Sequence, residues 1–316
     1  MAPCITVLGS LNIDLVSYVP HHPVPGETIT SRLFTVSPGG KGANQAVACA
    51  KLSRNSDLSS AAVDISFVGA VGSDTYGTDL LNSLRSYGVK VESVAVRKDQ
   101  RTGIAIIVVD ETDGQNRIIL SPESNYSVQR ADFESALGQK PDLLIMQLEI
   151  PLETVIQALR TATASKIPVL LNPAPAQTLP LEVYQNLSHI IVNESEAALL
   201  TNYSDSEFEN SSGLDRAVEF FIDKSVQNVV ITLGGRGVYF ATHTGRRALI
   251  PAIKSTMVVD TTAAGDTFVG SYALSIVTKG DHFDIETAVG TANRAAAKTV
   301  AKKGAQISIP WRSDLE

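Results

Sequence analysis

The 316-residue chain carries a formal net charge of −7, with 44% hydrophobic and 19% charged residues. This balance is ordinary for a globular enzyme, and it lacks the basic surface that nucleic acid or an anionic membrane would need. We therefore expect no nucleic-acid partner and no membrane partner. No apolar run approaches transmembrane length, and the two cysteines, Cys4 and Cys49, have no metal-ligand spacing. The sequence predicts a cytoplasmic protein, with the nucleus as an alternative location.

The chain begins with two predicted strands. Residues 5–8 form a short apolar run typical of a buried strand, and the alternation that follows puts Asn12 and Asp14 on one side of an extended backbone. An amide and a carboxylate in these positions can bind neighbouring hydroxyl groups. Taken alone, an ordinary turn at the end of a strand is the simpler interpretation.

A glycine-rich turn, PGGKGANQ, occupies residues 38–45 and opens a predicted helix. It is not a nucleotide-binding P-loop, because that pattern requires Ser or Thr after Gly-Lys and an earlier glycine, whereas Gly42 and Val36 hold those places. The turn instead presents Lys41 and Asn44 at a helix start. This arrangement is better suited to a polyhydroxylated molecule than to a triphosphate.

Three segments with alternating hydrophobicity predict a small antiparallel sheet. They are residues 28–36, 103–110 and 116–120. The dipeptide Asp113-Gly114 between the last two is a hairpin signal. We interpret these strands as a lid, formed by segments 15–38 and 97–121 of a single domain that covers residues 1–316.

The rest of the chain alternates short apolar strands with helices. Further strands are predicted at residues 65–71, 143–147, 168–172, 189–192 and 229–233. Further helices are predicted at residues 75–87, 152–165, 194–200, 214–225 and 283–303. Surface loops are predicted at residues 53–62 and 202–213. This order predicts the α/β fold class, as a Rossmann-like three-layer domain with a mostly parallel central sheet plus the small β-sheet lid. Ligands bind beyond the carboxyl ends of the strands in such sheets.

The stretch VVDTTAAGDTFVG, residues 258–270, is the strongest functional signal. Its two valines are predicted to end a strand, and its small residues open a helix predicted to run to residue 278. The backbone amides of residues 263–265 would converge at the positive end of the helix dipole, which favours phosphate oxygens. Asp266 would stand beside them as a carboxylate able to accept a hydroxyl proton. A plain helix start with an aspartate that complements the dipole explains the stretch about equally well.

Four motifs, taken in order, resemble those of the ribokinase-like, phosphofructokinase-B-type carbohydrate kinases. They are GSLNID at residues 9–14, GGKGANQ at 39–45, NESE at 193–196 and DTTAAGDTF at 260–268. Each motif alone is weak, whereas the ordered set is specific and spans nearly the whole chain. The resemblance implies ATP-dependent phosphorylation of D-ribose at its terminal O5 hydroxyl, giving D-ribose 5-phosphate and ADP. It also implies Mg²⁺, K⁺ as a monovalent activator, and a homodimer formed through the lid sheet.

The resemblance also implies roles for individual residues. The sugar would be bound by Asn12, Asp14, Gly40, Lys41, Asn44, Glu149 and Asp266. Asp266 would be the catalytic base, beside an anion hole formed by Ala263, Ala264 and Gly265. The nucleotide would contact Asn193, Thr232, Gly234, Gly235, Arg236, Gly237, Gly265 and Asn293, and Glu196 would help to place Mg²⁺ through water. K⁺ would be held, mostly through backbone carbonyls, by the loop residues Asp260, Thr262, Thr299, Lys302, Gly304 and Ser308.

The chain departs from the family pattern at a few positions. Ala263 stands where the wider family usually has glycine, and Gly235 replaces a frequent serine. Asn293 stands where bacterial relatives often have a histidine near adenine. These differences concern the contacts to the base more than the transfer site. Two alternatives stay open: a kinase of the same fold that acts on another sugar or a nucleoside, and a sugar-binding regulator without turnover.

Overall fold

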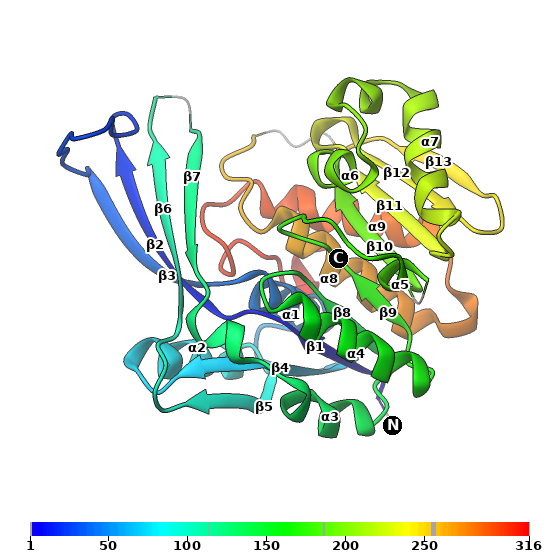
Figure 1. The fold of residues 1–316 in the computed structure, drawn as a ribbon, viewed down its shortest axis with the longest axis horizontal. Helices are drawn as coiled ribbons and strands as arrows, with labels where there is room; N and C mark the ends of the chain where they lie inside the picture. The colour runs from blue at the N-terminus through cyan, green and yellow to red at the C-terminus, as the bar shows by residue number, and fades with distance from the viewer. Residues whose placement is uncertain (1, 113, 186, 254–256, 316) are drawn as a thin grey trace.

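The computed structural model describes residues 2–112, 114–185, 187–253 and 257–315. Across these ranges, nine strands form one large sheet in the order β13-β12-β11-β10-β9-β8-β1-β4-β5 (Figure 1). Neighbouring strands from β5 to β11 are parallel, whereas β12 and β13 are added as antiparallel strands at one edge. The strands are β1 (Cys4–Leu8), β4 (Asp64–Gly72), β5 (Lys90–Arg97), β8 (Leu143–Met146), β9 (Val169–Leu171), β10 (His189–Asn193), β11 (Asn228–Thr232), β12 (Val238–Thr242) and β13 (Arg247–Ile250).

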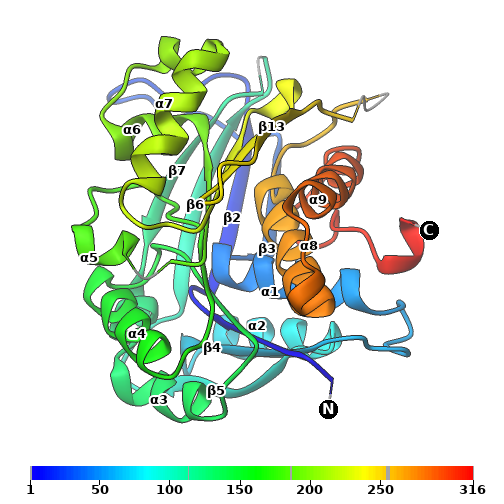
Figure 2. The same cartoon turned by 90° about the vertical axis from the view of Figure 1, so that its right-hand side faces the viewer.

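Helices cover both faces of the large sheet, as Figure 2 shows. One face carries α1 (Lys41–Ser53), α2 (Thr75–Ser86), α8 (Ala264–Lys279) and α9 (Ile285–Thr299). The other face carries α3 (Arg130–Gly138), α4 (Leu152–Ala164), α5 (Leu181–Tyr184), α6 (Glu194–Thr201) and α7 (Ser211–Ile222). Strand side chains alternate between the two layers, so that Val7 packs in the first core and Leu8 in the second. The predicted three-layer α/β architecture is confirmed. In the described ranges, no helix is both long and apolar enough to cross a lipid bilayer.

A second, smaller sheet stands apart from the large one (Figure 1). It contains β2 (Asn12–Val19), β3 (Leu33–Gly39), β6 (Gly103–Asp110) and β7 (Asn116–Ser121), in the order β3-β2-β6-β7. The prediction of a separate small sheet is confirmed, but its composition and pairing differ from expectation. The central pair, β2 with β6, is parallel, because the long crossover through β3, α1, β4, α2 and β5 returns the chain in the same direction. The strand predicted from residue 28 begins at Leu33, and Asp113 of the predicted turn lies outside the described residues.

Several other boundaries differ from the predictions. The strands β5, β12 and β13 and the helix α3 were not predicted. A strand was expected to end at Val258 and Val259, but the described part of this segment contains no strand. The chain there is neither helical nor paired with any sheet. Instead, the Val259 amide donates to the Val300 carbonyl at 2.7 Å. That carbonyl also accepts from the Asp260 amide, which helps to end α9 at Thr299 instead of residue 303. The predicted loop at 202–213 contains a short 3₁₀ helix that buries Phe208 completely.

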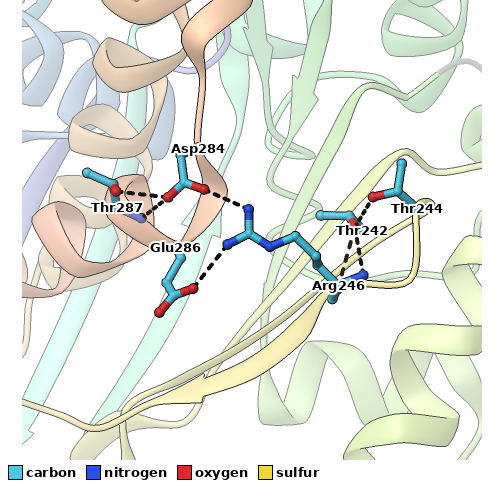
Figure 3. A network of polar contacts seen from close by, with 6 residues as sticks. All are labelled: Thr242, Thr244, Arg246, Asp284, Glu286 and Thr287. Atoms are coloured by element: carbon cyan, nitrogen blue, oxygen red, sulfur yellow. Dashed lines mark hydrogen bonds and ion pairs between the residues drawn. The ribbon is translucent and has the colours of Figure 1, made fainter.

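Arg246, in the turn between β12 and β13, ties the edge of the large sheet to the start of α9 (Figure 3). Its guanidinium donates to Asp284 at 2.7 Å and to Glu286 at 3.0 Å. Asp284 also caps α9 by accepting from the backbone and hydroxyl of Thr287. Arg246 first, and then Thr287, lower the pKa of Asp284 to about 2. The exposed cluster therefore links the edge of the large sheet to the start of α9, the helix that carries Asn293.

Candidate functional site

The packing of α1 against α8 sets the geometry of the predicted catalytic residue. Gly270 of α8 lies so close to α1 that a Cβ at this position would be 2.5 Å from the Ala48 Cβ. Asn44 and Asp266 each lie one helical turn before this contact, on the same side of their helices. Asn44 Nδ2 donates to Asp266 Oδ2 at 3.1 Å. A close helix crossing therefore joins two side chains that are 222 residues apart in sequence.

Glu149 gathers the predicted sugar-binding residues. Its carboxylate, which lies after β8, accepts from Ser10 Oγ at 2.6 Å and from the Lys41 backbone amide at 3.0 Å. The same oxygen lies 3.4 Å from Asn12 Nδ2, a longer contact. The start of β2, the start of α1 and the end of β8 therefore meet at one point.

Asn125 supports this group, and no pattern in the sequence points to it. Its side chain is 1% exposed, accepts from the Leu11 amide at 2.9 Å and donates to the Leu11 carbonyl at 3.0 Å. A third bond runs from Asn125 Nδ2 to Asn12 Oδ1 at 2.8 Å. It fixes the orientation of the Asn12 amide, with the oxygen towards Asn125 and the nitrogen towards Glu149. Asn125 sits in a short 3₁₀ helix without periodicity, so pattern analysis could not single it out.

Two glycines of the turn before α1 are required by close approach. Gly40 has φ +90°, and a Cβ on it would lie 2.7 Å from the Asn12 amide nitrogen. A Cβ on Gly39 would lie 2.1 Å from a carboxylate oxygen of Asp14. The predicted close-approach turn thus packs against the Asn12 backbone at Gly40 and against the Asp14 side chain at Gly39.

Carboxylates dominate the electrostatics around Lys41. Asp14 is 8% exposed, and burial, followed by the charges of Glu149 and Asp266, raises its pKa to about 7 against a smaller opposing effect of Lys41. Burial disfavours the charged form of Lys41, but Asp266, Glu149, Glu196 and Asp14 together raise its pKa above the ordinary value. Burial is also the main cause of the raised pKa of Glu196. Four carboxylates thus act on one lysine, which leaves an excess of negative charge that favours hydroxyl donors and cations.

A cavity of about 1000 Å³ adjoins this cluster. Its lining includes eight predicted nucleotide residues, namely Asn193, Thr232, Gly234, Gly235, Arg236, Gly237, Gly265 and Asn293. Residues not predicted for this role also line it, among them Asp205, Pro251, Ile253, Phe268 and Val300. Its volume lies in the upper range of small-molecule sites. Asp205 belongs to the segment expected to be a plain surface loop, where the run of polar residues gave no sign of a role in a site.

Three of the predicted nucleotide-side residues are engaged by the protein itself. The Arg236 guanidinium pairs with Glu194 and donates to the Phe208 carbonyl at 2.8 Å, so it holds the 205–209 segment in place. Asn293 Nδ2 donates to the Pro251 carbonyl at 2.8 Å. Asn193 caps α6 in a reciprocal capping box with Glu196, which does not line the 1000 Å³ cavity.

The start of α8 forms the predicted anion-binding turn with one modification. Ala263 is the N-cap and adopts φ 60°, a left-handed conformation that turns the chain into the helix. The Ala264 amide donates to the Thr261 carbonyl at 3.2 Å. This amide is therefore not free to bind an anion, contrary to the prediction. The amides of Ala263 and Gly265 donate to no residue in the described ranges, and they keep the capacity to bind an anion.

Asp260 joins the two parts of the predicted cation loop. Its carboxylate accepts from the Thr262 amide at 2.9 Å and from the Gly304 amide at 2.8 Å. The hydroxyls of Thr299 and Ser308 are used elsewhere, the first towards Thr267 at 2.9 Å and the second towards the Ala305 carbonyl at 2.7 Å. Among the described residues, no cluster of three or more His, Cys, Asp or Glu side chains suited to a metal ion occurs.

An α/β fold with a carboxylate in the first turn of a helix, between a cluster of polar side chains and a cavity of nucleotide size, is typical of a small-molecule kinase. The sequence pattern of the pfkB family carbohydrate kinases matches residues 3–312, and the chain belongs to that family. Ribokinase of Schizosaccharomyces pombe is 42% identical over 314 residues, which cover 97% of this chain and 94% of that protein.

Solved structures agree with this assignment. The structure of ribokinase from Giardia lamblia matches with a TM-score of 0.90 and 28% identity, over 100% of this chain and 98% of that one. The structure of Arabidopsis thaliana ribokinase complexed with ribose and ATP matches with a TM-score of 0.86 and 29% identity, with the same coverage.

Proposed function

We propose that this protein is a ribokinase, which transfers the γ-phosphoryl group of ATP to the O5 hydroxyl of D-ribose. The observation that carries the proposal is the position of Asp266. Its carboxylate lies on the first turn of α8, bonded to Asn44 on the sugar side, while the neighbouring Gly265 lines the nucleotide cavity. A base in this place can receive the proton of a hydroxyl that attacks a phosphoryl group.

The carboxylates and amides of the second sheet and α1 bind and orient the sugar in this proposal. Asp14 and Glu149 accept hydrogen bonds from sugar hydroxyls, while Asn12 and Asn44 can both donate and accept. Lys41 donates to a sugar oxygen and offsets part of the carboxylate charge. As the O5–P bond forms and the bond from γ-phosphorus to the β,γ-bridging oxygen breaks, the O5 proton moves to Asp266 and ADP leaves.

The turn at the start of α8 stabilises the phosphoryl group. The amides of Ala263 and Gly265, together with the positive end of the α8 dipole, neutralise part of the charge on the moving group. The nucleotide occupies the 1000 Å³ cavity, with Thr232, Gly234, Gly235 and Gly237 beside its phosphates and Asn293 on the base side. Alignment and charge stabilisation are the main contributions that phosphoryl transfer requires of a protein.

We propose two cations at this site, and the donor groups fit both. Four carboxylates around Lys41 leave negative charge to be neutralised, and Glu196 is suited to hold Mg²⁺ through water next to the ATP phosphates. In the described ranges, the carbonyl oxygens of Asp260, Thr262, Lys302 and Gly304 accept no backbone hydrogen bond, which leaves them free for K⁺. When bound, Mg²⁺ supplies charge neutralisation, and K⁺ supplies a fixed shape for the turn that precedes α8.

We further propose a homodimer formed through the second sheet, which serves as the lid of a single domain. One face of that sheet carries a row of aliphatic side chains in register across all four strands. The row is Val36, Leu15, Ile106 and Ile119. Val36, Ile106 and Ile119 are 49%, 42% and 62% exposed. A continuous apolar row on an open sheet favours pairing with a second copy of the chain.

Light scattering during gel filtration tests the dimer. The native chain should have about twice the 33.6 kDa mass of one copy, and Ile119→Glu should reduce it to one copy. Leu181→Glu is the matched control, because Leu181 is similarly exposed on α5. A native protein with the mass of a single copy contradicts the dimer.

We place the enzyme in the cytosol, in agreement with its two free cysteines, Cys4 and the buried Cys49.

The substrate and the base are tested together by kinetics. Rates of phosphate transfer from ATP to ribose, deoxyribose, fructose and adenosine should be highest for ribose, and a preference for adenosine would make the protein a nucleoside kinase. Asp266→Asn should keep ribose binding and reduce kcat by about 10²- to 10⁴-fold. A native protein that binds ribose without turnover would be the sugar-binding regulator, and an active Asp266→Asn variant would remove Asp266 from the role of base.

A further inference from the structure

The second oxygen of Asp266 is held by a residue to which the preceding mechanism gives no role. Gln45 Nε2 donates to Asp266 Oδ1 at 3.0 Å, and the Gln45 side chain is completely buried. Asn44 bonds the other oxygen, Oδ2. Each oxygen of the carboxylate therefore accepts one N–H, and both donors come from adjacent residues of α1.

The orientation of the Gln45 amide is determined by its neighbours. Asn172 Nδ2 donates to the Ile191 carbonyl of β10 at 2.9 Å. Because a carbonyl oxygen can only accept, the NH₂ end of Asn172 must face Ile191 and its oxygen must face Gln45. Gln45 Nε2 donates to that oxygen at 2.9 Å. The two hydrogens of the Gln45 NH₂ group are thus divided between Asn172 and Asp266.

A third buried amide is bonded to the far end of Gln45. Gln147 Nε2 donates to Gln45 Oε1 at 2.7 Å, and Gln147 is fully buried. This bond agrees with the orientation set by Asn172 but does not determine it. Removal of the Gln147 amide would leave Gln45 still locked by Asn172, and in the described ranges no hydrogen bond joins Gln147 to Asp266.

We propose that Gln45 is a positioning residue for Asp266, and that Asn172 keeps the NH₂ end of Gln45 turned towards the Asp266 carboxylate. If Gln45 rotated by half a turn, its oxygen would face Asp266 Oδ1, and two acceptors would repel one another. The buried amides therefore hold the carboxylate in a single orientation and leave its remaining lone pairs as the proton acceptors. This inference rests on the proposed role of Asp266 as the base.

Three variants of the full-length protein test the proposal by steady-state kinetics with ribose and ATP. Gln45→Met removes both donor hydrogens at nearly constant volume and should lower kcat by about 10- to 100-fold, the effect of a base displaced by about 1 Å. KM for ribose and for ATP should stay within about threefold of native. Asn172→Leu should lower kcat by about tenfold, because Gln45 is then free to rotate.

Gln147→Met is the matched control. It removes a buried amide from the same chain of bonds and should lower the urea midpoint about as much as Gln45→Met, yet keep kcat within about threefold of native. Equal losses of kcat in both variants would mean that the amides serve packing alone and would overturn the proposal. So would a Gln45→Met enzyme with kcat within threefold of native.

Two further outcomes separate this inference from the proposal on which it rests. Should Asp266→Asn lose turnover while Gln45→Met and Asn172→Leu retain it, only the positioning role fails. Should Asp266→Asn retain turnover, the base itself has been misassigned. If Gln45→Met does not fold, Asn172→Leu decides by the same criteria, because it leaves α1 unchanged.

Discussion

The substitution Asp14→Asn should stabilise the empty protein and weaken its binding of ribose. No residue in the described ranges donates a hydrogen bond to the Asp14 carboxylate in the structure, and its pKa is about 7 in place of 3.8. At about 1.4 kcal/mol for each pKa unit, the ionised group costs the folded protein up to about 4 kcal/mol above pH 7. Asparagine removes that charge and keeps the shape of the side chain.

The sign of the pH dependence follows from proton binding. Between pH 3.8 and about 7 the folded state holds the Asp14 proton more firmly than the unfolded state. The free energy of unfolding of the native protein therefore falls as the pH rises through this range. The variant lacks this fall, so its advantage should grow by about 2–3 kcal/mol from pH 5 to pH 8. For 316 residues, with an unfolding entropy of about 0.7 kcal/mol per degree, this corresponds to about 3–4 °C in Tm.

Thermal melts at pH 5 and pH 8, with and without ribose, measure both effects. Ribose affinity should fall by about 10- to 100-fold, the usual effect of losing a hydrogen bond to a charged group. Asp79→Asn, an exposed change on α2, should alter Tm at neither pH. A gain in Tm that is equal at the two pH values, or absent at both, would refute the argument from the buried charge.

The remaining predictions concern backbone contacts and the cation loop. Gly270→Ala should lower kcat by about tenfold and destabilise the fold by about 1–3 kcal/mol, because its Cβ would lie 2.5 Å from the Ala48 Cβ and separate α8 from α1. Steady-state kinetics measure the first effect and urea titration the second. Gly39→Ala should raise the ribose KM at least about tenfold, with the ATP KM little changed, because its Cβ would lie 2.1 Å from Asp14. Asp260→Ala should raise the K⁺ concentration needed for half-maximal rate by about fivefold or more, because the loop loses the two hydrogen bonds from backbone amides to the Asp260 carboxylate. Rates are measured across a K⁺ series, with sodium used to keep the ionic strength constant. An unchanged K⁺ dependence would contradict this prediction.

The alternation of apolar strands and helices was sufficient to predict the layers of this fold. It failed where a segment's structure depends on distant partners. The segment at Val258 has the β-branched residues of a strand, but its neighbours bond to the end of α9, and no local pattern reveals that partner. The strands β12 and β13 were missed because only pairing with β11 at the sheet edge makes them strands.

The candidate site was predictable where one motif contains several contacts. GGKGANQ holds Lys41 and Asn44, and the structure brings both to Glu149 or Asp266. Asn125 could not be predicted, because its partners, the Leu11 backbone and the Asn12 side chain, are more than 110 residues away in the sequence. Nor could the sequence reveal that Arg236 is engaged with Glu194, since an arginine in a glycine-rich turn is equally typical of phosphate binding.

The route of the chain between its two sheets has a consequence for ATP consumption. Residues 9–11, Gly40, residues 98–102 and Pro122 connect the main body to the second sheet, and Asn12 and Asp14 belong to that sheet. If the second sheet is the proposed lid, a rotation about these links would carry both side chains with it and leave Asp266 behind on α8. Capture of the acceptor and completion of the reaction centre would then occur in a single movement, so we expect spontaneous loss of phosphate to water to stay slow whenever the acceptor is missing.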